Sequence, residues 1–237
     1  MSGRLVVLDA AGTLVEVRGS IGAVYAALAR AAGADLDTAA VERGFAWAFQ
    51  AAPPLAFGGL DEAARPAAER GWWREVARRA LEAAGPLPTG FVFEVFFERA
   101  WSWFGAPEAW HVPADVRPGL RALRRAGCPL AVFSNWDGRL EPLLDRLGLA
   151  GYFARVLFSG GLPAAKPDPA AFHAARAALA EWAKDAPPIM VGDRIDHDIV
   201  PALEAGWGAV WLDRGGRGER PPVGAARVIG LPEVALL

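Results

Sequence analysis

The chain of 237 residues is poor in cysteine and lysine, and it contains no long hydrophobic run. Cys128 is the only cysteine, which excludes an internal disulfide and a cysteine-based metal site. No apolar run approaches the ~20 residues of a transmembrane helix, so we expect no membrane partner. The first strand-like segment begins within a few residues of the N-terminus and leaves no space for a secretory signal, which predicts a cytoplasmic protein. The formal net charge of -2 gives no electrostatic reason to expect a nucleic-acid partner.

The apolar content of the chain is nevertheless sufficient for a full core. Hydrophobic residues make up 53% of the sequence and charged residues 22%, as in an ordinary folded globular protein. The length allows one large domain or a core domain with a smaller second one. Cys128 lies within an apolar segment, which favours a buried packing role over a nucleophilic one.

The most informative stretch is Leu5-Val-Val-Leu-Asp-Ala-Ala-Gly-Thr-Leu14 near the N-terminus. Four apolar residues lead directly into Asp9, and small, flexible residues follow. A short apolar run bounded by turn residues is typical of a strand buried on both faces of a parallel sheet. Asp9 then stands at the end of this strand, where open α/β sheets carry their ligand chemistry.

A helical region interrupts this pattern soon after the first strand. Amphipathic periodicity, with Pro and Gly between segments, predicts helices over 21–32, 37–50, 61–84 and 89–104. An all-helical segment inserted into a chain that later turns α/β indicates a cap domain grafted onto a core. We expect a helical cap at 17–105 and a core domain formed by 1–16 together with 106–237.

Strands and helices alternate in the second half of the chain, which predicts an α/β domain with a parallel sheet and helices on both faces. The end of the chain is predicted to consist of mixed loops. The predicted strands are 129–133, 156–158, 188–191 and 209–212, and the predicted helices are 117–126, 140–147, 170–183 and 198–205.

Polar groups follow three of the predicted strands. Ser134 and Asn135 come after the second strand, as Asp9 does after the first, and Asp193 follows the strand at 188–191. The carboxyl ends of parallel strands share one edge of a sheet, so we expect these side chains to converge. Lys166, one of only two lysines, precedes Pro-Asp-Pro at a helix start, which favours a site residue over a solvated charge.

These residue types suit phosphoryl transfer. A carboxylate nucleophile takes the phosphoryl group and passes it to water, while a cation and hydroxyl or amide donors stabilise its oxygens. Two carboxylates beside an anion also require a hard divalent cation between them. Mg²⁺ takes oxygen ligands, so Asp9, a backbone carbonyl and Asp193 are sufficient to hold it.

The chain resembles the haloacid dehalogenase-like superfamily of hydrolases, with all four family motifs in order. These motifs are Asp9–Thr13, Ser134, Lys166 and Gly192-Asp193 with Asp198. The helical insertion corresponds to the family's C1-type cap on a Rossmann-like, doubly wound core. Ser-Asn-Trp-Asp-Gly-Arg-Leu at 134–140 is most similar to the branch named for rhythmically expressed gene 2.

The resemblance implies a role for each matched position. Asp9 is expected to be the nucleophile, and Ser134 and Lys166 are expected to hold the transferring group. Thr13 and Asn135 are assigned with them to substrate binding. Mg²⁺ is expected to bind to Asp9, the carbonyl of Ala11 and Asp193, with Asp198 in support. The implied partner is a small phosphate ester or a haloacid, and the protein is expected to be a monomer or a homodimer.

The sequence departs from the family at one position. Phosphatases of the family carry a second aspartate two residues after the nucleophile, which protonates the leaving group and then activates water. Ala11 occupies that position here, and the loss of such a group typically lowers the rate ~10²–10⁴-fold. Glu16 and His197 are weaker candidates for a replacement. His111 and His173 have no motif context and receive no role.

Ala11 leaves three further functions open. Carbon–halogen hydrolysis needs no acid for its leaving group, but the dehalogenases that the chain resembles are metal-free and lack the Asp193–Asp198 loop. Phosphonoacetaldehyde hydrolysis fits Ala11 but needs a cap lysine, and residues 15–110 contain none. The last alternative is a catalytically weak member that is kept for binding or regulation.

The final helix of the predicted cap is rich in aromatic residues. Phe93, Phe97, Trp101 and Phe104 recur at helical spacing and are predicted to form the cap's own core. Two further residues fall off that face and are predicted to line a substrate pocket or a dimer contact: Phe96 and Trp103.

Overall fold

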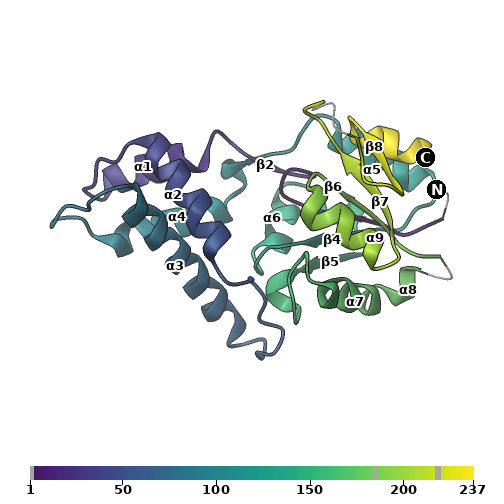
Figure 1. The fold of residues 1–237 in the computed structure, drawn as a ribbon, viewed down its shortest axis with the longest axis horizontal. Coiled ribbons are helices and arrows are strands. Elements are labelled where there is room, and N and C mark those ends of the chain that lie inside the picture. The colour runs from purple at the N-terminus through teal and green to yellow at the C-terminus, as the bar shows by residue number, and fades with distance from the viewer. Residues whose placement is uncertain (1–2, 184–185, 217–219) are drawn as a thin grey trace. The chain divides into compact units, whose positions relative to one another are not determined.

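A computed structural model describes residues 3–183, 186–216 and 220–237 (Figure 1). The chain forms two compact units, here called the core unit and the helical unit. The core unit comprises Met1–Glu16, Leu55–Arg65 and Val112–Leu237, and the helical unit comprises Val17–Pro54 and Pro66–His111.

The core unit is built on a six-stranded sheet in which every neighbouring pair of strands is parallel. The strand order is β5-β4-β1-β6-β7-β8, so the first strand lies in the middle of the sheet. A separate two-stranded sheet pairs β2 with β3. The strands are β1 (Val6–Leu8), β2 (Glu16–Val17), β3 (Trp110–His111), β4 (Leu130–Ser134), β5 (Arg155–Phe158), β6 (Ile189–Gly192), β7 (Gly208–Leu212) and β8 (Ala225–Val228).

The buried strands are the continuous apolar runs of the sequence. All residues of β1, β4 and β6 are buried, as two-sided coverage of a parallel sheet requires. In the register of the sheet, Leu8 of β1 lies beside Val132 of β4 and Val191 of β6. The three carboxyl ends therefore lie next to each other at one edge of the sheet.

Helices flank this sheet, which confirms the predicted α/β fold. The main core cluster joins alternate sheet residues such as Val7 and Met190 to Phe172 of α7 and Ala202 of α9. Cys128 is also buried, as predicted. The helices are α5 (Val116–Arg125), α6 (Leu140–Arg146), α7 (Pro169–Ala178), α8 (Ala180–Ala183) and α9 (Val200–Glu204), with short helical turns η2 (Ala150–Tyr152), η3 (Ser159–Gly161), η4 (Ile195–Ile199) and η5 (Leu231–Leu236).

The strand order reverses direction beside β1. After β1 the sheet grows through β4 to β5, and it then continues on the opposite side through β6, β7 and β8. The point between β1 and β6 is a topological switch point, where open α/β sheets form a crevice for their ligands.

The helical unit consists of four helices joined by turns. Ser20 caps the first helix by accepting from the backbone N–H of Ala23, and Asp37 caps the second in the same way. Gly44 allows close packing, since a Cβ there would lie 2.3 Å from the carbonyl oxygen of Ala80. The helices are α1 (Ile21–Ala31), α2 (Thr38–Ala51), α3 (Arg65–Ala84) and α4 (Phe93–Gly105), followed by the turn η1 (Pro107–Ala109).

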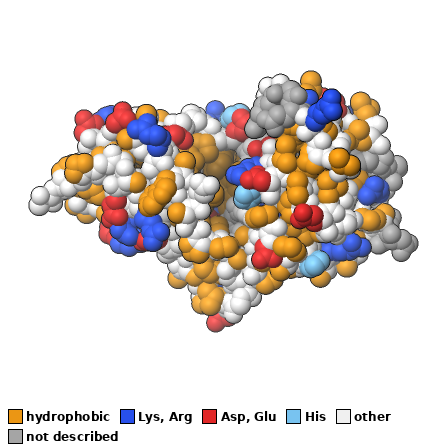
Figure 2. Space-filling model, in the orientation of Figure 1, with side chains coloured by type: hydrophobic (Ala, Val, Ile, Leu, Met, Phe, Trp, Pro, Cys, Tyr) orange, Lys and Arg blue, Asp and Glu red, His pale blue; other side chains and the backbone are white. Residues whose placement is uncertain are grey.

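The exposed side of the helical unit carries paired charges. Arg70 binds Glu98 and Arg74 binds Glu94, so the basic residues of α3 meet acidic residues of α4. In the face seen in Figure 2, basic and acidic side chains are interspersed in small groups over the surface in view. Among the described residues, no helix has the length and apolar content needed to cross a membrane.

Several predicted boundaries were wrong. The segment Leu55–Arg65 belongs to the core unit rather than to the insertion, because Phe57 and Gly58 donate backbone hydrogen bonds to the carbonyls of Gly160 and Leu162. The third helix begins at Arg65 rather than at Asp61. Asp61 instead caps a preceding turn by accepting from the N–H of Ala64.

The helix α4 also begins later than predicted, at Phe93 rather than at Thr89, because Phe91 closes a turn onto the carbonyl of Pro88. At 198–205 a π-helical turn, η4, precedes the short helix α9. The predicted terminal loops contain β8, whose short and only partly buried sequence gives little strand signal.

The prediction for Phe96 was also wrong. Phe96 is fully buried in the core of the helical unit, edge-to-face against Tyr25, and lines no surface. Phe97 is buried as predicted, whereas Trp103 is 38% exposed. The apolar face that α4 buries is wider than the single stripe of residues predicted from helical spacing. Three of the predicted core aromatics are partly buried and pack against that core: Phe93, Trp101 and Phe104.

Candidate active site

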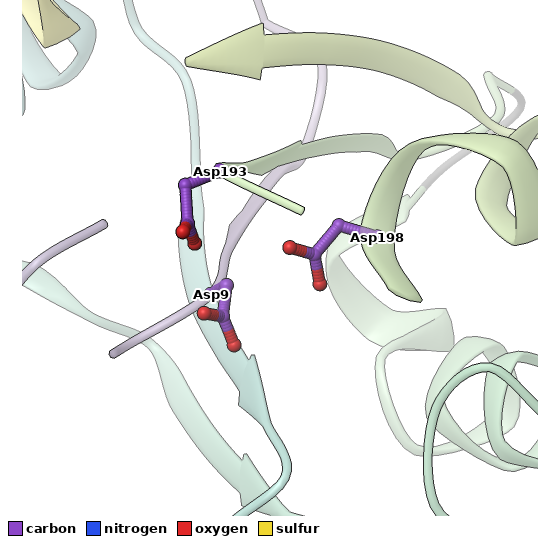
Figure 3. Close-up of side chains that lie close together, drawn as sticks. All are labelled: Asp9, Asp193 and Asp198. Carbon is purple, nitrogen blue, oxygen red and sulfur yellow. The ribbon is translucent and has the colours of Figure 1, made fainter. Parts of the chain in front are cut away.

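Three aspartates lie together at the switch point of the sheet (Figure 3). Asp9 follows β1, Asp193 follows β6, and Asp198 belongs to the turn η4. One carboxylate oxygen from each lies within 4.8 Å of those of the other two. Figure 3 shows the three side chains close together on separate segments of the chain. The predicted convergence of Asp9 with Asp193 is thus observed in the geometry, and Asp198 joins them.

Lys166 supplies the positive charge of this cluster. Its Nζ donates to Oδ1 of Asp9 at 2.9 Å and to Oδ1 of Asp198 at 2.5 Å. The lysine is 4% exposed, and the ammonium also lies 5.2 Å from the ring centre of Phe133. A buried, doubly paired lysine cannot be a solvated surface charge, which excludes that alternative for Lys166.

Asn135 holds the backbone beside Lys166. Its Nδ2 donates to the carbonyl of Lys166 at 2.7 Å, and its Oδ1 accepts from the N–H of Lys166 at 2.9 Å. The amide of Asn135 thus fixes both backbone groups of Lys166. From the sequence, Asn135 was predicted to bind substrate. Ser134, at the end of β4, is 2% exposed and next to β1 in the sheet.

The loop after Asp9 packs directly against Asp193. Thr13 is fully buried and donates from Oγ1 to Oδ1 of Asp193 at 3.4 Å. Gly12 has φ +80°, and a Cβ at that position would lie 2.5 Å from Oδ2 of Asp193. Only glycine fits here, both for its backbone conformation and for the space available. Ala11 precedes it on the exposed side of the loop.

The electrostatics of the cluster reflect an excess of negative charge. Burial, followed by repulsion from Asp9 and Asp198, raises the pKa of Asp193 to about 7. Burial is also the main cause that raises the pKa of Asp198, and Lys166 opposes it. Burial lowers the pKa of Lys166, but attraction to Asp198 and Asp9 outweighs this and leaves the pKa raised. One buried cation thus faces three carboxyl groups.

Neither candidate replacement for the missing aspartate has a direct link to Asp9 among the described contacts. The carboxylate of Glu16 lies 3.8 Å from the guanidinium of Arg214. The Nδ1 of His197 lies 3.0 Å from the exposed carboxylate of Asp196. Each is thus engaged with a neighbouring charge.

Two contacts of the site were not predicted from the sequence. Trp211 donates from its indole N–H to the carbonyl of Asp193 at 3.1 Å, and Arg214 binds backbone carbonyls of the loop after Asp9. Both residues lie in or directly after β7 (Gly208–Leu212), which ends at the same sheet edge. The rule that identified Asp9, a polar group at a strand's carboxyl end, also applies to Arg214 and was the available signal.

Comparisons with known proteins identify relatives of this chain. A family profile described as haloacid dehalogenase-like hydrolase matches residues 4–206. Over 173 residues the chain is 34% identical to haloacid dehalogenase-like hydrolase domain-containing protein 3 of Mus musculus, covering 73% of this chain and 67% of that protein. Over 174 residues it is 38% identical to a phosphoserine phosphatase of Thermus thermophilus, covering 72% and 67%.

A solved structure of an L-2-haloacid dehalogenase from Xanthobacter autotrophicus shares the fold. Its TM-score is 0.68 at 17% identity, with 99% of this chain and 97% of that chain covered. At this identity the likeness extends to architecture alone.

Proposed function

Because the chain belongs to the haloacid dehalogenase-like hydrolases, we propose that it is a Mg²⁺-dependent phosphatase of a small phosphorylated metabolite. The proposed nucleophile is Asp9. The observation that carries the proposal is the buried cluster in which Lys166 binds both Asp9 and Asp198 while Asp193 completes a group of three carboxylates. The relative from Thermus thermophilus named as a phosphoserine phosphatase supports the same type of chemistry.

The donor set fits Mg²⁺. All three side chains offer carboxylate oxygens, which are the ligands this hard cation takes, and a backbone carbonyl such as that of Ala11 suits it equally. Burial and then repulsion from Asp9 and Asp198 raise the pKa of Asp193 in spite of the attraction of Lys166, so a further cation beside these carboxylates would favour the ionised form. Asp9, Asp193 and Asp198 are the proposed holders of the ion. When bound, Mg²⁺ supplies positive charge opposite the oxygens of the phosphoryl group.

The chain's own residues carry the bond changes. A carboxylate oxygen of Asp9 attacks phosphorus, the phosphorus–oxygen bond to the leaving group breaks, and an aspartyl phosphate forms. Water then attacks that phosphorus, which releases inorganic phosphate and restores the Asp9 carboxylate. Lys166 orients Asp9 and offers a cation to the transferring group. Ser134, at the neighbouring strand end, is the proposed hydroxyl donor.

Asn135 and Thr13 act on either side of this group. We assign Asn135 to the positioning of Lys166, because its amide binds both backbone groups of that lysine. Thr13 steadies the carboxylate of Asp193 through its hydroxyl. Ala11 provides no proton donor, so the leaving group must depart unaided or take its proton from water.

The test is phosphate release from a panel of phosphate esters with Mg²⁺ and with EDTA. Wild type is compared with Asp9→Asn, which keeps size and burial but removes the nucleophile. Release that requires both Mg²⁺ and Asp9 supports the proposal, and equal release from the two proteins contradicts it. Tight ligand binding without turnover over the whole panel would instead favour a regulatory member of the family.

Ala11 favours one second candidate, the hydrolysis of a carbon–halogen bond. A halide leaves without a proton, so an alanine at this position costs that reaction nothing. The group of three carboxylates argues against it, because a metal-free dehalogenase has no use for Asp193 and Asp198 together. Halide release from 2-haloacids that persists in EDTA would establish this alternative.

A further inference from the structure

Arg214 connects the loop after Asp9 to the rest of the core unit. Its Nη1 donates to the carbonyl of Gly12 and its Nη2 to the carbonyl of Thr13, each at 2.7 Å. Its Nε donates to the carboxylate of Asp115, at 3.1 Å and 3.0 Å from the two oxygens. The planar guanidinium therefore spans two consecutive carbonyls on one side and an acid on the other, a geometry for which arginine is suited.

The acid that receives Arg214 is itself fixed. Oδ2 of Asp115 also accepts from the backbone N–H of Leu231 at 2.9 Å, which ties it to the C-terminal turn η5. Glu16 adds a second negative charge 3.8 Å from Nη1. All three guanidinium nitrogens have acceptors within the protein, and the side chain is 20% exposed. These contacts favour a structural role for Arg214 over the binding of a substrate anion.

The two carbonyls that Arg214 binds belong to residues in contact with Asp193. Gly12 lies so close that a Cβ would overlap the Asp193 carboxylate, and Thr13 donates to that same carboxylate. A movement of this loop therefore changes the surroundings of Asp193. It also moves the carbonyl of Ala11, one peptide away.

We propose that Arg214 is a positioning residue that holds the Gly12–Thr13 backbone so that the loop presents Ala11 and Thr13 correctly to Asp193. Its consequence for Mg²⁺ rests on the function proposed above. Its consequence for the loop can be measured without metal or substrate. The charge alone is insufficient, because a lysine ammonium cannot reach two carbonyls and a carboxylate in one plane.

The test compares Arg214→Lys with Arg117→Lys, a matched control in the same unit. Arg117 also donates to two consecutive carbonyls, those of Leu147 and Gly148, neither of which belongs to a family motif. The first measurement is amide hydrogen exchange of the metal-free proteins. The second is the affinity of each protein for Mg²⁺ alone, by calorimetry.

We expect Arg214→Lys to accelerate exchange in the peptide covering 10–15, where the N–H groups of Leu14 and Val15 bind the carbonyl of Ala10. We also expect its Mg²⁺ affinity to fall about 10–100-fold, as is usual when a residue that orients metal ligands is lost. Arg117→Lys should leave both quantities at wild-type values. Asp115→Asn weakens the ion pair that anchors Arg214 and leaves the loop itself unchanged. This variant should give the same changes at smaller size, and it replaces Arg214→Lys in the test if that variant fails to fold.

Wild-type exchange at 10–15 in both Arg214→Lys and Asp115→Asn would overturn the proposal, as would equal effects from Arg117→Lys. Failure of the proposed function has a different signature. If wild type binds no Mg²⁺ but exchange at 10–15 still rises in Arg214→Lys, the positioning role of Arg214 stands and the metal-dependent function falls.

Discussion

The switch point of the sheet and the helical unit place opposite demands on the sequence. For the proposed function, Asp9, Asp193 and Lys166 at the switch point must each carry one specific charge, and the neighbouring Gly12 admits no side chain. In the helical unit, the core of Ala, Leu and aromatic residues requires only apolar volume in the right place. The candidate site can therefore be predicted from the identity of its residues, whereas the helical unit can be predicted only from the spacing of its apolar residues.

The sharpest test of this contrast changes one residue at the switch point. Ala11→Asp restores a carboxyl group where phosphatases of the family have one, and the exposed position has space for it. We expect phosphate release from alkyl phosphates to rise ~10²–10⁴-fold, because the new group can protonate the leaving alkoxide and then activate water. Release from p-nitrophenyl phosphate should rise less, since only the activation of water, and not the protonation of its leaving group, gains from the new carboxyl group.

Ala11→Asn is the matched control, because the amide has the same shape and cannot donate a carboxyl proton. The rate on alkyl phosphates should stay at the level of wild type in this variant. A rise in Ala11→Asn as large as that in Ala11→Asp would show that shape or polarity, and not proton transfer, limits the reaction.

The predictions made from the sequence differ in accuracy between the same two regions. The βα alternation predicted the sheet, and the polar residues at strand ends predicted that Asp9 and Asp193 meet, because parallel strands of known direction leave one edge for them. Arg214 follows the carboxyl end of β7, as Asp9 follows β1, but its role was missed because the strand-end pattern does not say that its partners are carbonyls some 200 residues earlier. Spacing placed Phe96 on the wrong face, since a helix packed by both α1 and α3 buries more than one stripe.

The helical unit supplies the second test. Phe96→Ala removes a fully buried ring that contacts Tyr25 edge-to-face, so we expect the free energy of unfolding to fall by about 3–5 kcal/mol. Mg²⁺ affinity per folded molecule should remain that of wild type, because the ring serves packing in the helical unit alone. Chemical denaturation and calorimetry at low temperature measure the two quantities.

Trp103→Ala is the comparison within the same helix. Trp103 is 38% exposed, so its loss should cost about 1 kcal/mol or less although the side chain is larger. A greater cost for Trp103→Ala than for Phe96→Ala would mean that burial does not decide which aromatic residue holds the unit together.

The smallest expected effect concerns the charge at the switch point. The pKa of Asp193 is raised to about 7 from an ordinary value of 3.8. Between these values the native protein retains a proton that the unfolded chain has lost, so metal-free stability should fall as pH rises through this window and level off above it. The effect should be of order 1 kcal/mol, because the residue is only partly shielded from solvent.

Mg²⁺ should reverse this slope, because the ion binds the ionised carboxylate and proton loss then favours the bound state. The melting temperature gained on adding Mg²⁺ should therefore grow between pH 4 and about 7, the pKa of Asp193. Asp193→Asn should remove the gain and reduce the slope to the part that comes from Asp198, whose pKa is also raised. Asp196→Asn should keep both, because Asp196 is an exposed acid of the same loop whose pKa is lowered by its bond to Arg194. A metal-free melting temperature that does not decline over this range would show that the three carboxylates repel each other less than their spacing implies. The electrostatic argument for a divalent cation at this site would then be weaker.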